Sequence, residues 1–265
     1  MRFSARNRRA VGDVRTIVDL VVVVLAFLTA IIDIIFGMGF GLTLTPILLF
    51  LNYTPKEIVP ALLLSSLGGG IFSTIFNHRF KNADFTPGSR HFRIVMVIGV
   101  VGIAGSIVGA TVNTGISNFV LTLYIGTLIM ATGVFLLLNK SLRVEFSWMK
   151  LGLLSLFGSF NKGISGSGFG PIVTTGLLYM GTQEKVAVSI QSFSELFVSL
   201  VGFAAFFVSG ATSNWSLTLS LLIGVIASTP LAALIVNKVE GGTLRKAIAV
   251  VTVVLGAATI LRLLV

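Results

Sequence analysis

Long apolar segments constrain this chain more than any other feature. A helix needs roughly 20 predominantly apolar residues to cross the hydrocarbon core of a bilayer, and several runs reach that length. The sequence is 55% hydrophobic and 11% charged, whereas a soluble domain usually carries about 25% charged residues. We therefore expect an all-α polytopic protein of the plasma or inner membrane, with the lipid bilayer as its surroundings.

Basic residues gather in short polar segments between the apolar runs. Of the 19 Lys and Arg residues, 15 lie within 1–16, 78–93, 139–150 and 237–246. This pattern is typical of cytoplasmic loops. It argues against a nucleic-acid partner despite the net charge of +10, and it predicts a cytoplasmic N-terminus. The chain has no cysteine, which excludes a disulfide framework and a Cys-based metal site.

Two glycine motifs interrupt apolar runs. Gly37-Met38-Gly39-Phe40-Gly41 is followed by Thr45 and Pro46, and Gly166-Ser167-Gly168-Phe169-Gly170 is followed by Pro171. Glycine costs about 1 kcal/mol relative to alanine inside a helix, and proline suits the first turn of a new helix. We expect a break at each motif and a short half-helix that starts at Pro46 or Pro171. Such breaks persist in a bilayer only where they are buried in protein or line a cavity.

The identical spacing of the two motifs predicts an internal duplication into two four-segment repeats, each with one glycine-broken, re-entrant-like helix. Eight straight crossings would place the basic segment 237–246 outside. A re-entrant dip at 151–180 reduces the count to seven and returns that segment to the cytoplasm, which the charges favour. The expected divisions are a basic cytoplasmic N-terminus at 1–16, a first transmembrane repeat at 17–138, a cytoplasmic linker at 139–146 and a second transmembrane repeat at 147–265.

Three charged residues lie inside apolar segments, where charge is costly and often functional. Asp33 precedes Gly37 by four residues, and Lys162 precedes Gly166 by four, so an acid and a base occupy equivalent positions. They could form an ion pair across the two halves. Alternatively, Lys162 attracts an anion while Asp33 or Glu195 carries a proton. The competing interpretations are a structural or interfacial role for Asp33, a structural role for Lys162 and a structural hydrogen-bonding role for Glu195.

The half-helix N-termini would favour an anion, because their unpaired N–H groups and helix dipole are positive. If both face one cavity, their charges converge there with that of Lys162. Polar side chains on the following helices could donate hydrogen bonds, although serines in membrane helices often bond their own helix. The candidate substrate-binding residues are Gly37, Gly39, Gly41, Thr45, Pro46, Ser65, Ser66, Lys162, Gly166, Ser167, Gly168, Gly170, Pro171, Gln191, Ser192 and Ser194, and those for proton coupling are Asp33 and Glu195.

The two glycine motifs with their downstream prolines, the duplication and the basic mid-chain loop resemble the TauE/SafE sulfite exporter family, also called the toluene-sulfonate uptake permease family. The resemblance covers residues 17–264, although the family's first motif usually has more consecutive glycines where Met38 and Phe40 stand here. It implies a secondary carrier for sulfite, sulfonates or related sulfur-containing or organic anions.

Other functions fit the sequence less well. An anion channel with the same two breaks, or a carrier of a different small solute, remains an alternative. Gly163-Ile164-Ser165-Gly166 matches a protease G-x-S-G motif, but the two histidines lie in a loop away from it, so we expect no enzyme activity. We expect neither a cofactor nor a metal, because the acidic residues are scattered. The small-residue helix at 94–112 could serve internal packing or a homo-oligomer contact.

Overall fold

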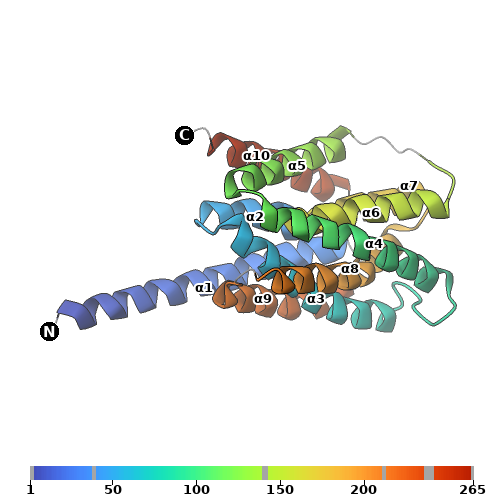
Figure 1. The fold of residues 1–265 in the computed structure, drawn as a ribbon. Coiled ribbons are helices and arrows are strands. Elements are labelled where there is room, and N and C mark those ends of the chain that lie inside the picture. The colour runs from blue at the N-terminus through green and yellow to red at the C-terminus, as the bar shows by residue number, and fades with distance from the viewer. Residues whose placement is uncertain (1–2, 38–39, 139–142, 211–212, 236–241, 264–265) are drawn as a thin grey trace.

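The computed structural model describes residues 3–37, 40–138, 143–210, 213–235 and 242–263, with side chains described from Leu20 onward apart from 242–245 and Ala247. All regular structure in these ranges is helical (Figure 1). The helices are α1 (Phe3–Phe36), α2 (Phe40–Phe50), α3 (Pro55–Arg79), α4 (Arg90–Gly115), α5 (Asn118–Leu138), α6 (Trp148–Ser165), α7 (Phe169–Tyr179), α8 (Glu184–Val208), α9 (Trp215–Ile235) and α10 (Gly242–Leu261).

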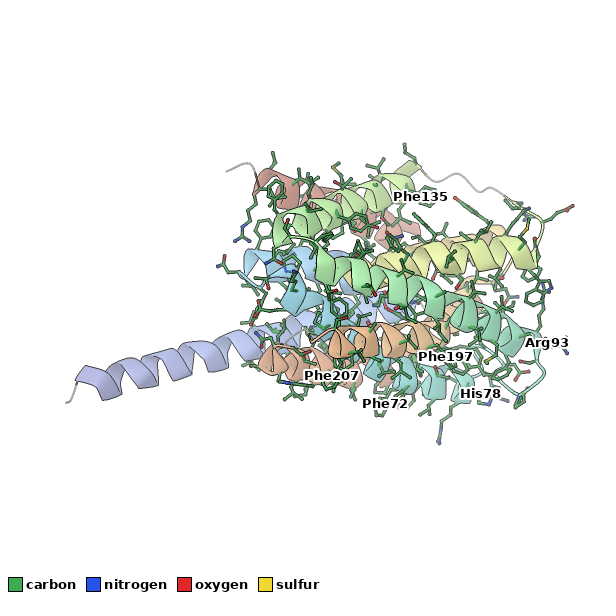
Figure 2. All side chains as sticks on the ribbon, in the orientation of Figure 1. Phe72, His78, Arg93, Phe135, Phe197 and Phe207 are labelled. Atoms are coloured by element: carbon green, nitrogen blue, oxygen red, sulfur yellow. The ribbon has the colours of Figure 1, made fainter. Side chains whose placement is uncertain are left out.

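The length of its apolar helices and its apolar exterior identify this bundle as a multi-pass membrane protein. Among the described residues, five helices are long and apolar enough to cross a bilayer: α3, α4, α5, α8 and α9. Large hydrophobic side chains are exposed on the outside, including Phe72, Phe135 and Phe207 (Figure 2). A contiguous apolar exterior of this kind is unstable in water and fits contact with lipid. The polytopic all-α class predicted from the sequence is therefore confirmed.

The two ends of the bundle contain different termini and loops. Figure 1 shows both chain termini and the α4–α5 turn at one end, and the α3–α4 loop at the other. His78 and Arg93 lie at that second end (Figure 2). Arg79, Lys81 and Arg90 belong to the same loop region. The N-terminal part of α1 projects beyond the first end of the bundle, so the helix starts well before the apolar run predicted from Ile17.

Glycines bring two helix pairs into close backbone contact. A Cβ added to Gly105 or Gly109 of α4 would collide with the backbone of α6. One added to Gly224 of α9 would collide with the carbonyl of Val23 in α1. Small residues allow membrane helices to approach closely where lipid supplies no hydrophobic drive for association. The small-residue series on α4 therefore serves packing inside this chain.

The start of one helix matches its sequence signal, whereas the start of another does not. α3 begins at Pro55, and the Glu57 carboxylate accepts hydrogen bonds from the Thr54 N–H and hydroxyl, each at 2.9 Å. The predicted start of a half-helix at Pro46 was wrong, because α2 begins at Phe40 and contains Pro46. An interior proline loses one hydrogen bond, whereas leaving residues 40–45 non-helical would expose several backbone groups to an apolar environment. α7 likewise begins two residues before Pro171.

Candidate functional site

The chain leaves helical geometry at both glycine motifs. α1 ends at Phe36, and Gly37 has a φ of 68°. α6 ends at Ser165, and the φ values of Gly166 and Gly168 are 71° and 85°. Positive φ carries a steric penalty for residues with a Cβ but not for glycine. The glycines therefore allow the chain to turn between α1 and α2 and between α6 and α7.

The two motifs lie directly against each other. A Cβ added to Gly41 would lie 2.6 Å from the Cβ of Ser167 and 2.8 Å from the Gly166 carbonyl oxygen. One added to Gly170 would collide with the carbonyl of Gly37. Segments far apart in the sequence thus meet in the interior, and the absence of side chains at these glycines makes the contact sterically feasible.

A buried ion pair lies beside this contact. Lys162, in the last turn of α6, places Nζ 2.5 Å from Oε1 of Glu195 on α8. The same Nζ donates a hydrogen bond to Oγ of Ser66 on α3 at 2.8 Å. The second carboxylate oxygen, Oε2, accepts one from Nε2 of Gln191 at 2.6 Å. Lys162 is 2% exposed and Glu195 is 9% exposed, so three helices enclose the pair.

The environment of this pair makes it costly to keep. Moving two charges out of water carries a desolvation penalty of several kcal/mol per ion, which a pair offsets only with good geometry and further hydrogen bonds. Ser66 and Gln191 supply such hydrogen bonds. Apolar residues of similar volume are often equally stable in place of a buried pair. A charged pair in the interior of a membrane bundle is therefore a candidate for function.

Asp33 holds the start of α2. Its carboxylate accepts a hydrogen bond from the backbone N–H of Phe40, the first residue of α2, and its main-chain oxygen accepts one from the Gly37 N–H at 2.6 Å. At α7 the N-cap residue is Gly168, which provides no side-chain cap, and the position equivalent to Asp33 is occupied by Lys162. A resident carboxylate therefore neutralises one positive helix end, while the first turn of α7 has no acidic cap.

Asp33 and Glu195 line one small cavity. Ser66 and Ser73 of α3 and Ser192 of α8 share the lining with them. The cavity has a volume of about 20 Å³, which is room for one water molecule. Helices α1, α2, α3, α8 and α9 all contribute to its wall. The cavity is small, and its wall combines the two carboxylates and three serines with apolar residues.

The remaining candidate substrate-binding residues differ in their hydrogen bonds and in their distance from the glycine motifs. The Ser65 and Ser194 hydroxyls donate to carbonyls of their own helices, as serines in membrane helices often do. Thr45 is fully buried in α2, and its hydroxyl has no hydrogen-bond partner in the described structure. A Cβ added to Gly170 would lie 3.6 Å from Nε2 of Gln191, so Gln191 adjoins the first turn of α7. Gly39 lies outside the described residues.

A direct ion pair of Asp33 with Lys162 was one of two interpretations of the sequence; within the described residues Lys162 forms its ion pair with Glu195. The sequence analysis missed Ser73 in the cavity wall. Ser66 and Ser73 are seven residues apart, which places them on one helix face, so helical periodicity alone could have identified Ser73.

The hydroxyl of Ser165, the nucleophile candidate, donates to the Asn161 carbonyl at 2.7 Å. Within the described residues no group of three or more His, Cys, Asp or Glu could hold a metal.

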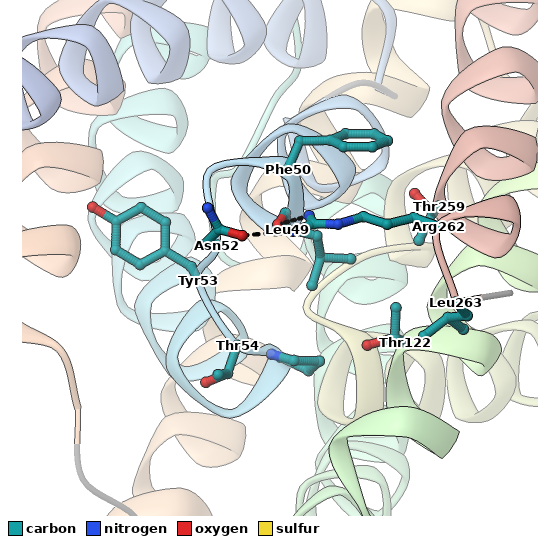
Figure 3. Close-up of a pocket in the computed structure, with 10 residues that line it drawn as sticks. Leu49, Phe50, Asn52, Tyr53, Thr54, Thr122, Thr259, Arg262 and Leu263 are labelled. Carbon is teal, nitrogen blue, oxygen red and sulfur yellow. Dashed lines mark hydrogen bonds between the residues drawn. The ribbon is translucent and has the colours of Figure 1, made fainter. Parts of the chain in front are cut away.

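The far end of α2 is held from another helix. Arg262, the residue directly after α10, donates hydrogen bonds to the Leu49 carbonyl and, at 2.6 Å, to Oδ1 of Asn52 (Figure 3). Its guanidinium carbon lies 5.5 Å from the centre of the Phe50 ring. A cation at a helix C-terminus pairs with the negative end of the dipole. These contacts occur in a cavity of about 230 Å³ at the α2–α3 turn.

Membrane-crossing helices that enclose buried charges where two interrupted segments meet are typical of membrane transporters. The chain belongs to the sulfite exporter TauE/SafE family, whose family model matches residues 22–259. The family resemblance inferred from the glycine motifs is thereby confirmed, and the chain is a membrane transporter of this family.

Two relatives from Bacillus subtilis (strain 168) are similar over most of their length. Probable membrane transporter protein YtnM is 24% identical over 226 residues, covering 81% of this chain and 73% of the relative. Probable membrane transporter protein YunE is 22% identical over 267 residues, covering 89% of this chain and 95% of the relative. No solved structure matches the chain.

Proposed function

We propose that this protein is a secondary transporter of small anions, with sulfite, sulfonates or related sulfur-containing or organic anions as substrates. The observation that carries the proposal is Lys162, a buried cation beside the meeting point of the two glycine motifs. The uncapped first turn of α7 adds a positive helix end close to it. The family description, sulfite exporter, agrees with an anionic substrate.

We propose further that the chain is built from two inverted repeats, α1–α5 and α6–α10. The helix contacts support this arrangement. If each helix of α1–α5 is matched in order with one of α6–α10, every contact given below has a counterpart between the matched helices or joins two matched helices. α1 packs on α9 as α6 packs on α4, and α3 packs on α9 as α8 packs on α4. α3 packs on its counterpart α8, and α5 on α10. Repeats related by a two-fold axis in the membrane place substrate sites at their interface.

In this arrangement each interrupted segment enters and leaves the membrane at one end. α2 and α7 have 11 residues each, which span about half of the roughly 30 Å hydrocarbon core. The backbone N–H of Val144, before α6, donates to the carbonyl of Tyr179, at the end of α7, at 2.9 Å. We infer that the re-entrant dip expected for the second repeat also occurs in the first, so that α3, α4, α5, α8, α9 and α10 cross the membrane, in place of the seven or eight crossings expected from the sequence.

Transport would proceed by alternating access. The cavity of about 20 Å³ must enlarge before an oxyanion can enter, and rocking of one repeat against the other would open it to either side in turn. Lys162 and the backbone N–H groups at the break would hold the anion. Asp33 or Glu195 would carry a proton where transport is proton-coupled.

Counterflow in proteoliposomes tests this function. Vesicles are loaded with unlabelled sulfite, a small sulfonate or a carboxylate, and the corresponding labelled anion is supplied outside. We expect transient accumulation of label with a sulfur anion and none with the carboxylate. Absence of accumulation with every anion would reject the anion carrier.

The alternatives are an anion channel and a carrier of a different small solute. Single-channel currents across a planar bilayer, without counterflow, would establish the channel. Counterflow with an uncharged or cationic solute only would establish the other carrier. The small volume of the cavity between the charged residues favours a carrier, because it leaves no open pore there.

A further inference from the structure

The partner of Lys162 is itself a carboxylate, an anion of this chain in the place where a substrate anion would bind. We propose that Glu195 and the transported anion compete for Lys162, and that a proton bound by Glu195 releases the lysine, so that one proton enters the site with each anion. This inference rests on the proposed function and specifies the coupling residue and the stoichiometry.

The contacts of Lys162 support competition. Its ammonium group has three N–H donors, of which one faces Glu195 at 2.5 Å and another Ser66 at 2.8 Å. Both oxygens of Glu195 are engaged, one by Lys162 and the other by Gln191. Because Lys162 is only 2% exposed, its third donor does not face open solvent, and we infer that an anion pairs with Lys162 in the position that the Glu195 carboxylate occupies.

The charges around the cavity support coupling to one proton. The charged groups that face the pair are Asp33 from α1, Lys162 from α6 and Glu195 from α8. The cavity-lining residues of α3 carry hydroxyls or no polar group, and those from α2 and α9 are Phe40 and Val225. With all three groups ionised, the site carries one net negative charge. A bound monoanion raises the net negative charge of the site from one to two, and uptake of one proton returns it to one. Anion binding and proton binding are therefore thermodynamically linked.

The hydrogen bonds indicate Glu195 as the proton carrier. Asp33 is engaged with the N–H of Phe40 at the start of α2 and forms no ion pair within the described residues. Gln191, next to Glu195, has a buried carboxamide oxygen without a hydrogen-bond partner. An ionised Glu195 only accepts hydrogen bonds, whereas a protonated carboxyl can also donate one. After the side-chain amide turns over, its oxygen can accept that proton, so the site contains partners for both forms of Glu195.

The wild-type protein in detergent provides the first test. The probe is a small aliphatic sulfonate, which stays ionised where carboxylates titrate, so its own protonation does not contribute. We expect about one proton to be taken up from weakly buffered solution for each sulfonate bound. Over the range in which Glu195 loses its proton, affinity should fall about tenfold per pH unit. Sulfonate binding without proton uptake would overturn the inference and leave the anion carrier standing.

Variants then assign the proton. Glu195→Gln should bind sulfonate without taking up a proton, with an affinity that no longer varies with pH. Asp33→Asn should keep the pH slope even where its affinity changes, and Asp84→Asn, in the exposed α3–α4 loop, is the remote carboxylate control. If the affinity for sulfonate still varied with pH in Glu195→Gln but no longer varied with pH in Asp33→Asn, the assignment of the proton to Glu195 would be overturned.

A more conservative variant, Glu195→Asp, tests the same inference if Glu195→Gln folds poorly. Glu195→Asp withdraws the carboxylate by one methylene and weakens its competition for Lys162. We expect it to bind sulfonate more tightly than wild type at neutral pH and still to take up one proton. Unchanged or weaker binding would contradict competition. If wild type neither binds a sulfur anion nor shows counterflow, the proposed function fails and this inference fails with it.

Discussion

At the scale of single residues, the Lys162–Glu195 pair is the feature whose removal is most informative. In Lys162→Ala, Glu195 remains in the interior without a counter-charge. Removing one partner of a buried pair costs about 3–5 kcal/mol, so we expect a correspondingly lower free energy of unfolding and loss of sulfonate binding. Thermal unfolding in detergent and a binding titration measure the two effects.

The double variant Lys162→Met/Glu195→Met separates stability from binding. Replacing both partners of a buried pair by apolar residues is often neutral or stabilising, so we expect the unfolding temperature to recover while sulfonate binding stays lost. A double variant that binds sulfonate as well as wild type would remove this pair from the substrate site.

The sequence identifies these residues as candidates, but it does not show how they pair. Asp33, Lys162 and Glu195 stand out because charge is rare in apolar segments. The partner of Lys162 depends on how α6, α8 and α3 pack, and Lys162 and Glu195 lie on helices separated by α7. Equivalent positions in the two motifs pointed instead to Asp33, whose carboxylate binds the start of α2.

At the scale of helices, the contact between the two glycine motifs should tolerate no added volume. Gly41→Ala places a methyl group 2.6 Å from the Cβ of Ser167. Overpacking of this kind typically costs 1–3 kcal/mol, so we expect a lower unfolding temperature and reduced counterflow. Gly152→Ala on α6 is the matched control, because its added Cβ meets nothing within 4 Å. Equal effects of the two variants would mean that the contact does not matter.

The attachment of α2 to α10 should control local opening of α2. Arg262→Gln shortens the side chain and removes its charge, so the hydrogen bonds to Leu49 and Asn52 and the contact with Phe50 are lost. Hydrogen bonds to a charged group contribute about 1.5–3 kcal/mol. We expect faster amide hydrogen exchange in the last turn of α2 and unchanged exchange in α7. Unaltered exchange in α2 would show that other contacts hold this turn.

Helix starts could be predicted where the signal is local. Thr54, Pro55 and Glu57 form such a signal, and α3 begins there. Pro46 was misleading, because the apolar surroundings favour helix through residues 40–45 even though an interior proline loses a hydrogen bond. The mutual contact of the two motifs could not be inferred from either motif alone, because it depends on how α2 and α7 pack within the bundle.

At the scale of the whole molecule, the hairpin arrangement makes a prediction about sidedness. The chain has no cysteine, so single cysteines at exposed positions report accessibility to an impermeant thiol reagent. Pro87→Cys and Gln183→Cys should be labelled from the same side of the membrane, and Gly115→Cys from the opposite side. Eight straight crossings would place residues 87 and 183 on opposite sides.

The same experiment tests the N-terminus. The basic loops predict a cytoplasmic location for residue 87. Because the N-terminus lies at the other end of the bundle (Figure 1), the hairpin arrangement places it across the membrane from residue 87. The cytoplasmic N-terminus inferred from its arginines stays a prediction, and a cysteine at Ser4 would decide between the two.

The contact between the glycine motifs also bears on how such a chain can evolve. Gly41 is bounded by Ser167, and Gly170 by Gly37, so the surface that limits each half belongs to the other half. A bulkier residue in one motif can be accommodated only after the residue that it contacts in the other motif has become smaller or has moved. Selection must therefore act on the two motifs as one unit, and among divergent descendants these positions should change in concert while the lipid-facing residues drift independently.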